Sequence, residues 1–351
     1  MRFSFTLFYV CKRMSIKGRS SIRFLAAAIV YAVFAGHLYW PYLSRFDGWQ
    51  YLLIVNVCLA SLGCYVLSRR WVAGFIESFF AGAIYGFGPF ILGLAKYHPT
   101  AGLLAAAIPW LFCPAAFGFK EKRRWLRIPL VVLPFLAIVV FFQASTHYRL
   151  FAVSTQARLH SADLTGLFAP LITAKQDLTL IGFYHIPIAA LVIGFCMMLA
   201  ARRYSVILII AVGTTLGFCG SFCEVSPVIW LAVPVLCCSV LIGEGMQGLV
   251  SAGFNDRAWI LVTTAVMAAL SVVTLLLATK YFQTFLGLGA GYAKLFTEAG
   301  KMYLLGAIVG AIIFFMIRAK LRMHLLRQLV LCAAMAVDIF IGARYIIDKF
   351  L

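Results

Sequence analysis

Polar residues that could take part in chemistry gather in one stretch of this chain, from about Gln143 to Thr179. It is the longest polar segment between apolar runs, and its ionisable side chains are His147, Arg149, Arg158, His160, Asp163, Lys175 and Asp177. Arginine and protonated histidine bind phosphate through charge-assisted hydrogen bonds. Arg149, Arg158, His147 and His160 could therefore bind the phosphates of a lipid-linked substrate. The same cations could instead contact anionic lipid headgroups without specificity.

A carboxylate lies close to the end of the first apolar run, at Asp47 in the sequence SRFDGWQ. A carboxylate at this place could act as a general base, or could hold a divalent cation against a phosphate. An ordinary solvated loop acid is the alternative interpretation. The sequence leaves the cofactor open, and a divalent cation is one candidate. The ten cysteines show no C-x-x-C pairs, and the common nucleotide-binding, hydrolase and zinc-protease motifs are absent.

Acidic residues also lie inside the apolar runs, where an ionisable group is costly and by default indicates a function. Glu77 could instead pair with Arg69 or Arg70 near the inner interface. Asp338 could be neutralised by a basic neighbour such as Arg344. For both residues an ion pair is thus the alternative to a functional role.

Glu244 is a third acid within an apolar run, in the sequence GEGMQG. The glycines on both sides would let another backbone approach closely, or would let the helix break. Glu244 is therefore a candidate substrate-binding residue that faces a cavity.

The elements that must position these residues are membrane helices. Of 351 residues, 64% are hydrophobic and 12% are charged, whereas about a quarter of the residues in a soluble domain are charged. Several runs approach the roughly 20 apolar residues that cross the hydrocarbon as a helix. They lack the period-two alternation of a barrel strand. We therefore expect an all-α, polytopic integral membrane protein.

About eleven spans are predicted. A basic segment, residues 1–23, precedes a single membrane domain, residues 24–351. The interrupted glycine-rich run around Glu244 is the weakest of the predicted spans. The spans fall at about 24–43, 50–68, 72–95, 100–119, 127–143, 180–201, 205–222, 232–254, 258–278, 302–318 and 328–346.

The distribution of lysine and arginine predicts the orientation. One side of the predicted spans collects 20 of the 30 basic residues and should face the cytoplasm, together with the N-terminus. The loop 144–179 then lies on the outer face, as does an amphipathic segment at 280–301 that could lie along the interface. Because the basic residues sit between spans, the net charge of +19 indicates membrane lipids as partners and not nucleic acid.

The segment from Asn56 to Phe117 contains NVCLASLGCYVLSRRW, FFAGAIYGFGPFILG, YHP and AAAIPWLFCPAAF. It resembles the membrane core of the YfhO-like proteins, polytopic bacterial members of the GT-C glycosyltransferase superfamily. The later order is similar too, with LFAPLI, LIGFYHIPIAAL, paired arginines and SPVIWLAVPVL ahead of a glycine-rich helix. The likeness covers about residues 50–255.

The resemblance implies transfer of a sugar from a polyprenyl-phosphate donor at the outer face of a bacterial plasma membrane. In this superfamily an acidic residue of the first outer loop is the catalytic base or a metal ligand, and Asp47 is the matching position. The first outer loop is much shorter here than is usual in the superfamily. A non-catalytic relative, or one that needs a partner subunit, is therefore also implied.

Two other classes of function fit the same sequence. A transporter or lipid flippase would have Glu77, Glu244 and Asp338 along its path, although no internal repeat of the kind common in transporters is evident. A structural subunit of a membrane complex would account for the short loops and the scarcity of acids.

Overall fold

The computed structural model describes residues 17–94, 99–117, 127–148, 182–219, 222–285, 290–319 and 323–351. Within these ranges the regular elements are helices, and extended pairing is limited to one isolated bridge between Phe222 and Val225. The predicted all-α class is confirmed for this part of the chain.

The helices are connected by short turns, several of them with 3₁₀ geometry. In chain order they are α1 (Lys17–Tyr39), η2 (Trp40–Arg45), η3 (Gly48–Tyr51), α2 (Leu52–Ser68), α3 (Phe75–Gly86), α4 (Pro89–Gly93), α5 (Pro99–Phe117), α6 (Arg127–Tyr148), α8 (His185–Ala200), α9 (Tyr204–Phe218), α10 (Pro227–Trp230), α11 (Ala232–Ser251), η7 (Phe254–Asp256), α12 (Arg257–Leu277), α13 (Lys280–Phe285), α14 (Ala290–Arg318) and α15 (His324–Phe350).

Eight helical stretches among the described residues are long and apolar enough to cross a membrane. Three shorter apolar helices accompany them, at Pro129–Ser145, His185–Ala200 and Tyr204–Phe218. Each predicted span overlaps one of these stretches. The helices therefore indicate a multi-pass membrane protein, while crossing by the three shorter helices stays a prediction.

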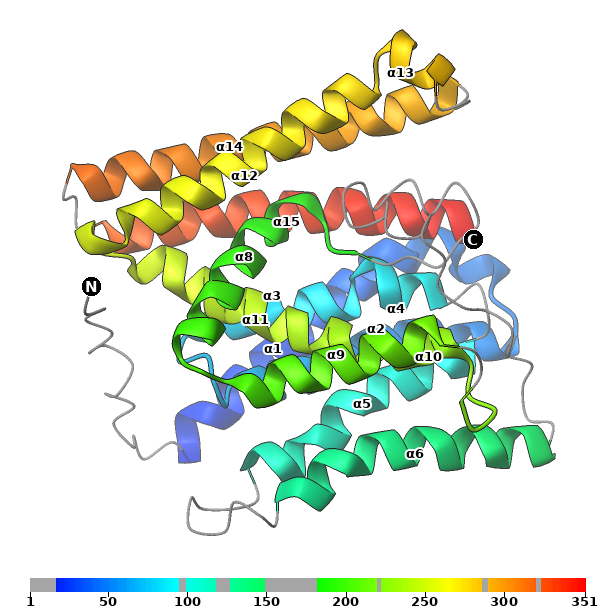
Figure 1. The fold of residues 1–351 in the computed structure, drawn as a ribbon. Helices are drawn as coiled ribbons and strands as arrows, with labels where there is room; N and C mark the ends of the chain where they lie inside the picture. The colour runs from blue at the N-terminus through cyan, green and yellow to red at the C-terminus, as the bar shows by residue number, and fades with distance from the viewer. Residues whose placement is uncertain are drawn as a thin grey trace.

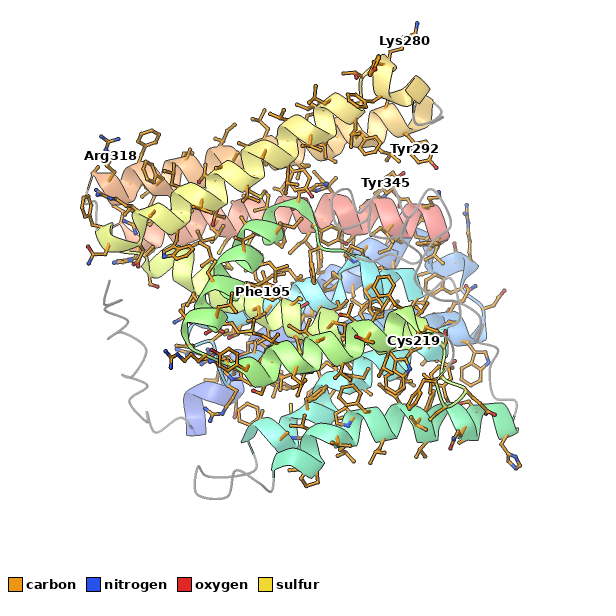
Figure 2. The ribbon with its side chains drawn as sticks, in the orientation of Figure 1. Phe195, Cys219, Lys280, Tyr292, Arg318 and Tyr345 are labelled. Carbon is orange, nitrogen blue, oxygen red and sulfur yellow. The ribbon has the colours of Figure 1, made fainter. Side chains whose placement is uncertain are left out.

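Helix α11 lies at the centre of the bundle, and it packs against α2, α3, α5, α8, α9 and α15. In the most apolar part of the stretch Pro227–Ser251, which contains α11, 89% of the residues are buried inside the bundle. The corresponding share for the stretch that contains α12 is 28%. Figure 1 shows α12 and α14 side by side as a pair along one flank of the bundle, next to α15. Figure 2 places Lys280 and Arg318 at opposite ends of that pair.

The third predicted span, 72–95, is divided into α3 and α4. Pro89 begins α4 and has no N–H to continue the hydrogen bonds of α3. The carbonyl of Phe87, at the break, accepts a hydrogen bond of 2.5 Å from the hydroxyl of Tyr184. A side chain from the start of α8 thus satisfies a backbone group that the break leaves open, as a buried position in a membrane requires.

The glycine-rich span around Glu244 is a continuous helix, α11, and the break considered for it is wrong. Gly245 and Gly248 face α8, and Gly243 faces α3. A Cβ atom on Gly245 would lie 1.8 Å from the carbonyl oxygen of Ala190, and one on Gly194 would lie 2.1 Å from that of Leu241. Small residues that let two backbones meet are the usual basis of helix packing in membranes.

The predicted interfacial segment 280–301 is helical where the structure describes it. Its first residues form the short helix α13, and residues from Ala290 onward belong to α14, which continues to Arg318. With 29 residues α14 is roughly 40 Å long, and therefore longer than the hydrocarbon layer is thick. The first turns of α14 can therefore lie outside the hydrocarbon, and the interfacial position of the segment stays a prediction.

We expect Gly245→Ala to lower the thermal stability of the protein in detergent or nanodiscs, because the new methyl group must push α8 away from α11. Overpacking of this kind costs about 1–3 kcal/mol. Gly36→Ala is the matched control, since a Cβ atom on Gly36 meets nothing within 4 Å. An equal loss in both variants would contradict the close α8–α11 contact.

Candidate functional site

Asp47 is exposed, in the turn between η2 and η3. Its carbonyl oxygen accepts a hydrogen bond of 3.0 Å from the backbone N–H of Gln50, and its own N–H donates to Oε1 of Gln50 at 3.3 Å. Gly48 follows with a φ of +42°, a conformation that glycine adopts without strain. The backbone at Asp47 is thus held in place while the residue remains accessible.

Aromatic side chains surround this turn. Trp40, Trp49 and Tyr51 are 75%, 66% and 51% exposed, although all three are large. Exposed tryptophan and tyrosine are typical of the membrane–water interface. The exposed aromatic residues near Asp47 are thus of the kind found at that interface.

The C-terminal end of α15 is hydrogen-bonded to η2, next to the turn that carries Asp47. The hydroxyl of Tyr42 in η2 donates to Oδ1 of Asp348 at 2.7 Å. Nε of Arg344 donates to both carboxylate oxygens of Asp348, at 3.1 and 3.2 Å. Arg344 thus pairs with Asp348 one turn along its own helix, and the expected pairing of Arg344 with Asp338 is wrong.

The predicted phosphate-binding residues are described only in part. His147 is exposed in the last turn of α6. Arg149, Arg158 and His160 lie outside the described residues, as does most of the loop 144–179. A phosphate-binding group formed by these four residues therefore stays a prediction.

Glu244 is 3% exposed and forms an ion pair with Arg203. Nη1 of Arg203 lies 3.0 Å from each carboxylate oxygen. Arg202 adopts a left-handed φ of 52° in the turn between α8 and α9, and Arg203 follows directly after it. Glu244 thus contacts an arginine of this turn, and its role as a substrate-binding residue that faces a cavity stays a prediction.

Glu77 is 4% exposed and accepts a hydrogen bond of 2.8 Å from Nε2 of Gln328 in α15. Arg69 instead donates to backbone carbonyls of the turn between α2 and α3, and Arg70 donates to a carbonyl of α5. The expected pairing of Glu77 with Arg69 or Arg70 is therefore wrong. The partner of Glu77 is Gln328, which lies 251 residues further along the chain.

Asp338 is 1% exposed, in the middle of α15, and its partners are at the start of α8. Nδ1 of His185 lies 3.0 Å from Oδ1, and the backbone N–H of Ile186 donates to Oδ2 at 2.6 Å. His185 was not among the predicted site residues. The sequence YHIP marks a helix start, but only the fold shows that this start lies against Asp338.

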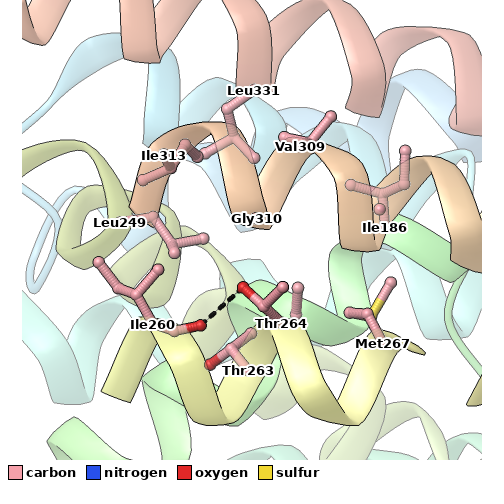
Figure 3. Close-up of a pocket in the computed structure, with 12 residues that line it drawn as sticks. Ile186, Leu249, Ile260, Thr263, Thr264, Met267, Val309, Gly310, Ile313 and Leu331 are labelled. Carbon is pink, nitrogen blue, oxygen red and sulfur yellow. Dashed lines mark hydrogen bonds between the residues drawn. The ribbon is translucent and has the colours of Figure 1, made fainter. Parts of the chain in front are cut away.

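An apolar pocket lies where α8, α11, α12, α14 and α15 meet (Figure 3). Its polar side chains are Thr263 and Thr264, and the hydroxyl of Thr264 donates to the carbonyl of Ile260 at 2.8 Å. No charged side chain lines it. The pocket is thus a packing gap without a group that could do chemistry.

Among the described residues, no group of three or more histidines, cysteines or acids is placed to hold a metal ion. Comparison of the chain with protein-family models, with curated proteins and with solved structures finds no match. The candidate site is therefore judged by its own chemistry, and the accessible carboxylate of Asp47 is its main component.

We expect Glu244→Gln to lower the free energy of unfolding by about 1.5–3 kcal/mol, because the variant leaves the guanidinium of Arg203 with a neutral partner. Chemical or thermal unfolding in a defined detergent measures the change. Lys301→Gln is the control, since the pair of Lys301 and Glu298 is solvent-exposed and should contribute less than about 1 kcal/mol. An equal loss of unfolding free energy in Glu244→Gln and Lys301→Gln would show that the buried pair of Glu244 and Arg203 does not stabilise the bundle.

Proposed function

We propose that this protein is a GT-C-like membrane protein that acts on polyprenyl-phosphate-linked sugars at the outer face of a bacterial plasma membrane. One observation carries the proposal. Asp47 is an exposed carboxylate near exposed aromatic residues, whereas Glu77, Glu244 and Asp338, the acids within the predicted spans, are buried against partners. It therefore has the accessibility that a catalytic or metal-binding carboxylate requires.

In the proposed reaction Asp47 acts as a general base. As a hydroxyl group of the acceptor attacks the anomeric carbon of the sugar, a carboxylate of Asp47 takes the proton of that hydroxyl. The bond between the anomeric carbon and the phosphate oxygen breaks, and the polyprenyl phosphate leaves with the electron pair. If a divalent cation takes part, Asp47 is the residue that would hold it, and the cation would neutralise the phosphate.

The surroundings of Asp47 suit such a substrate. Arg45, two residues earlier, is exposed and offers a guanidinium to phosphate. Trp40 and Trp49 offer apolar surface at the depth where a polyprenyl chain leaves the bilayer. The proposal includes His147, in the last turn of α6, and Arg149, Arg158 and His160 of the predicted outer loop as phosphate ligands.

We expect Asp47→Asn to abolish sugar transfer while binding of the donor is kept, because the amide cannot accept the proton. A positioned general base contributes typically 10²–10⁴-fold, so the rate should fall by about that factor. The measurement is turnover and binding of polyprenyl-phosphate sugars by the purified protein.

Glu298→Gln is the matched control, because Glu298 is also a solvent-exposed carboxylate but pairs with Lys301 on α14. It should leave turnover unchanged. Binding without turnover in the wild type would identify a non-catalytic relative that handles the same lipids. Absence of binding would overturn the proposal.

A further inference from the structure

Helices α1 and α15 pack against each other, and both belong to stretches that are long and apolar enough to cross a membrane. These two stretches end at Arg45 and at Phe350. The hydroxyl of Tyr42 in η2 donates to Oδ1 of Asp348 at 2.7 Å, so the two ends lie next to each other. Charged groups at these ends are therefore expected at the membrane surface, where lipid headgroups lie.

Two arginines lie close to this hydrogen bond. In α15, Nε of Arg344 donates to both carboxylate oxygens of Asp348, at 3.1 and 3.2 Å. In η2, Arg45 follows Tyr42 by three residues, and residues three apart share one face of a 3₁₀ helix. Both guanidinium groups act electrostatically on the hydroxyl of Tyr42. Two positive groups from different elements are therefore near the same hydroxyl.

Both arginines keep hydrogen-bond donors that no described residue uses. Arg344 binds Asp348 through Nε, and its two terminal amino groups donate to none of the described residues. The guanidinium of Arg45 is exposed and is likewise without an ion pair in the described ranges. In the same ranges the carboxylate of Asp47 pairs with neither arginine. The two guanidinium groups thus offer unused N–H donors to an anion.

An apolar surface lies beside the arginines, along α1 and α15. The ring of His37 on α1 stacks on the ring of Phe340 on α15, with 6.0 Å between their centroids. A Cβ atom on Gly36 would meet nothing within 4 Å, so there is open space at this point of α1. We call this region the α1–α15 surface. It consists of Val33, Gly36, His37, Val337, Phe340 and Ile341, which are exposed or half-buried.

The α1–α15 surface continues into the arginines. Arg344 follows Ile341 by three residues and Phe340 by four, and residues three or four apart are neighbours on one face of an α-helix. Asp348 follows Arg344 by four residues on the same face. One face of α15 is therefore apolar within the predicted span and charged at its end.

This order of apolar and charged residues matches a lipid with an anionic headgroup. Arginine binds phosphate through charge-assisted hydrogen bonds, and basic groups at the membrane surface attract anionic lipids. A small soluble anion would use the arginines and leave the α1–α15 surface uncovered. A lipid uses both, because its phosphate and its chain are joined in one molecule.

We propose that one lipid with an anionic phosphate headgroup binds here, with its phosphate on Arg45 and Arg344 and one hydrocarbon chain along the α1–α15 surface. Asp348 and Tyr42 are positioning residues, since Asp348 holds Nε of Arg344 and Tyr42 joins η2 to α15. Arg45 is shared with the proposed sugar-donor site. Binding of this lipid does not rest on sugar transfer, because a lipid without a sugar fits the same groups.

The test is native mass spectrometry of the purified full-length protein in detergent, titrated with phosphatidylglycerol or phosphatidylcholine. We expect the wild type to bind one phosphatidylglycerol more tightly than further copies, and more tightly than phosphatidylcholine. Arg344→Gln should weaken binding of that first phosphatidylglycerol by about tenfold or more, because charge-assisted hydrogen bonds to the phosphate are lost. Arg45→Gln carries the same expectation and removes no ion pair among the described residues, so it decides if Arg344→Gln does not fold.

Lys301→Gln is the matched control, since Lys301 is also an exposed cation that pairs with an acid of its own helix. It should leave the affinity for phosphatidylglycerol unchanged. An equal loss of affinity in Arg344→Gln and Lys301→Gln, or equal binding of the two lipids by the wild type, would overturn the proposal.

Gly36→Leu tests the position of the chain, because the new side chain would fill the open space on α1. We expect it to weaken binding of phosphatidylglycerol, and wild-type affinity in this variant would contradict the proposed place of the chain. Glycerol phosphate has the headgroup chemistry without the chains. If it displaced bound phosphatidylglycerol as effectively as unlabelled phosphatidylglycerol does, the site would be one for free phosphate, and the proposal would be wrong.

Discussion

A carboxylate inside a membrane needs a partner that the bilayer does not supply, and this requirement governs how the bundle is assembled. Glu244 finds its partner in Arg203, and Asp338 in His185 and the backbone of Ile186. Oε1 of Glu77 accepts from Gln328, while its buried Oε2 has no hydrogen-bond partner among the described residues. Every one of these contacts joins different elements of the fold. The pairs therefore specify which helices lie together, where apolar surfaces alone would pack in several ways.

The close packing of α8 and α11 brings the same elements together. Gly194 and Gly245 let the two backbones approach to a distance that no side chain would permit. Glu244, next to Gly245, then meets Arg203 just beyond the end of α8. The two glycines and the ion pair between Glu244 and Arg203 thus both support the contact between α8 and α11, the helix at the centre of the bundle.

Composition and apolar run length were enough to predict the all-α class and the approximate place of the spans, because crossing a bilayer imposes helices of a set length. The partners of the buried acids were not predictable in this way. The expectations for Glu77 and Asp338 used neighbours in the sequence, Arg69, Arg70 and Arg344, whereas the actual partners are brought in by other helices.

The candidate site was predictable to a similar extent. The position of Asp47 after an apolar run indicated an accessible loop acid, and the residue is exposed. The interruption expected near Glu244 failed because glycine in a membrane helix serves packing as readily as a break. His185 was missed because a single histidine at a helix start has no distinguishing spacing, and its importance comes from Asp338 in a distant helix.

The central claim is that Asp47 is an accessible carboxylate, while Glu77, Glu244 and Asp338, the acids within the predicted spans, are buried against partners. Labelling of the native protein with a water-soluble carbodiimide and an amine, followed by mass spectrometry, tests it directly. Modification of Asp47, with Glu77, Glu244 and Asp338 protected until the protein is unfolded, is the predicted result. Modification of any of those three in the native protein, or protection of Asp47, would contradict the account.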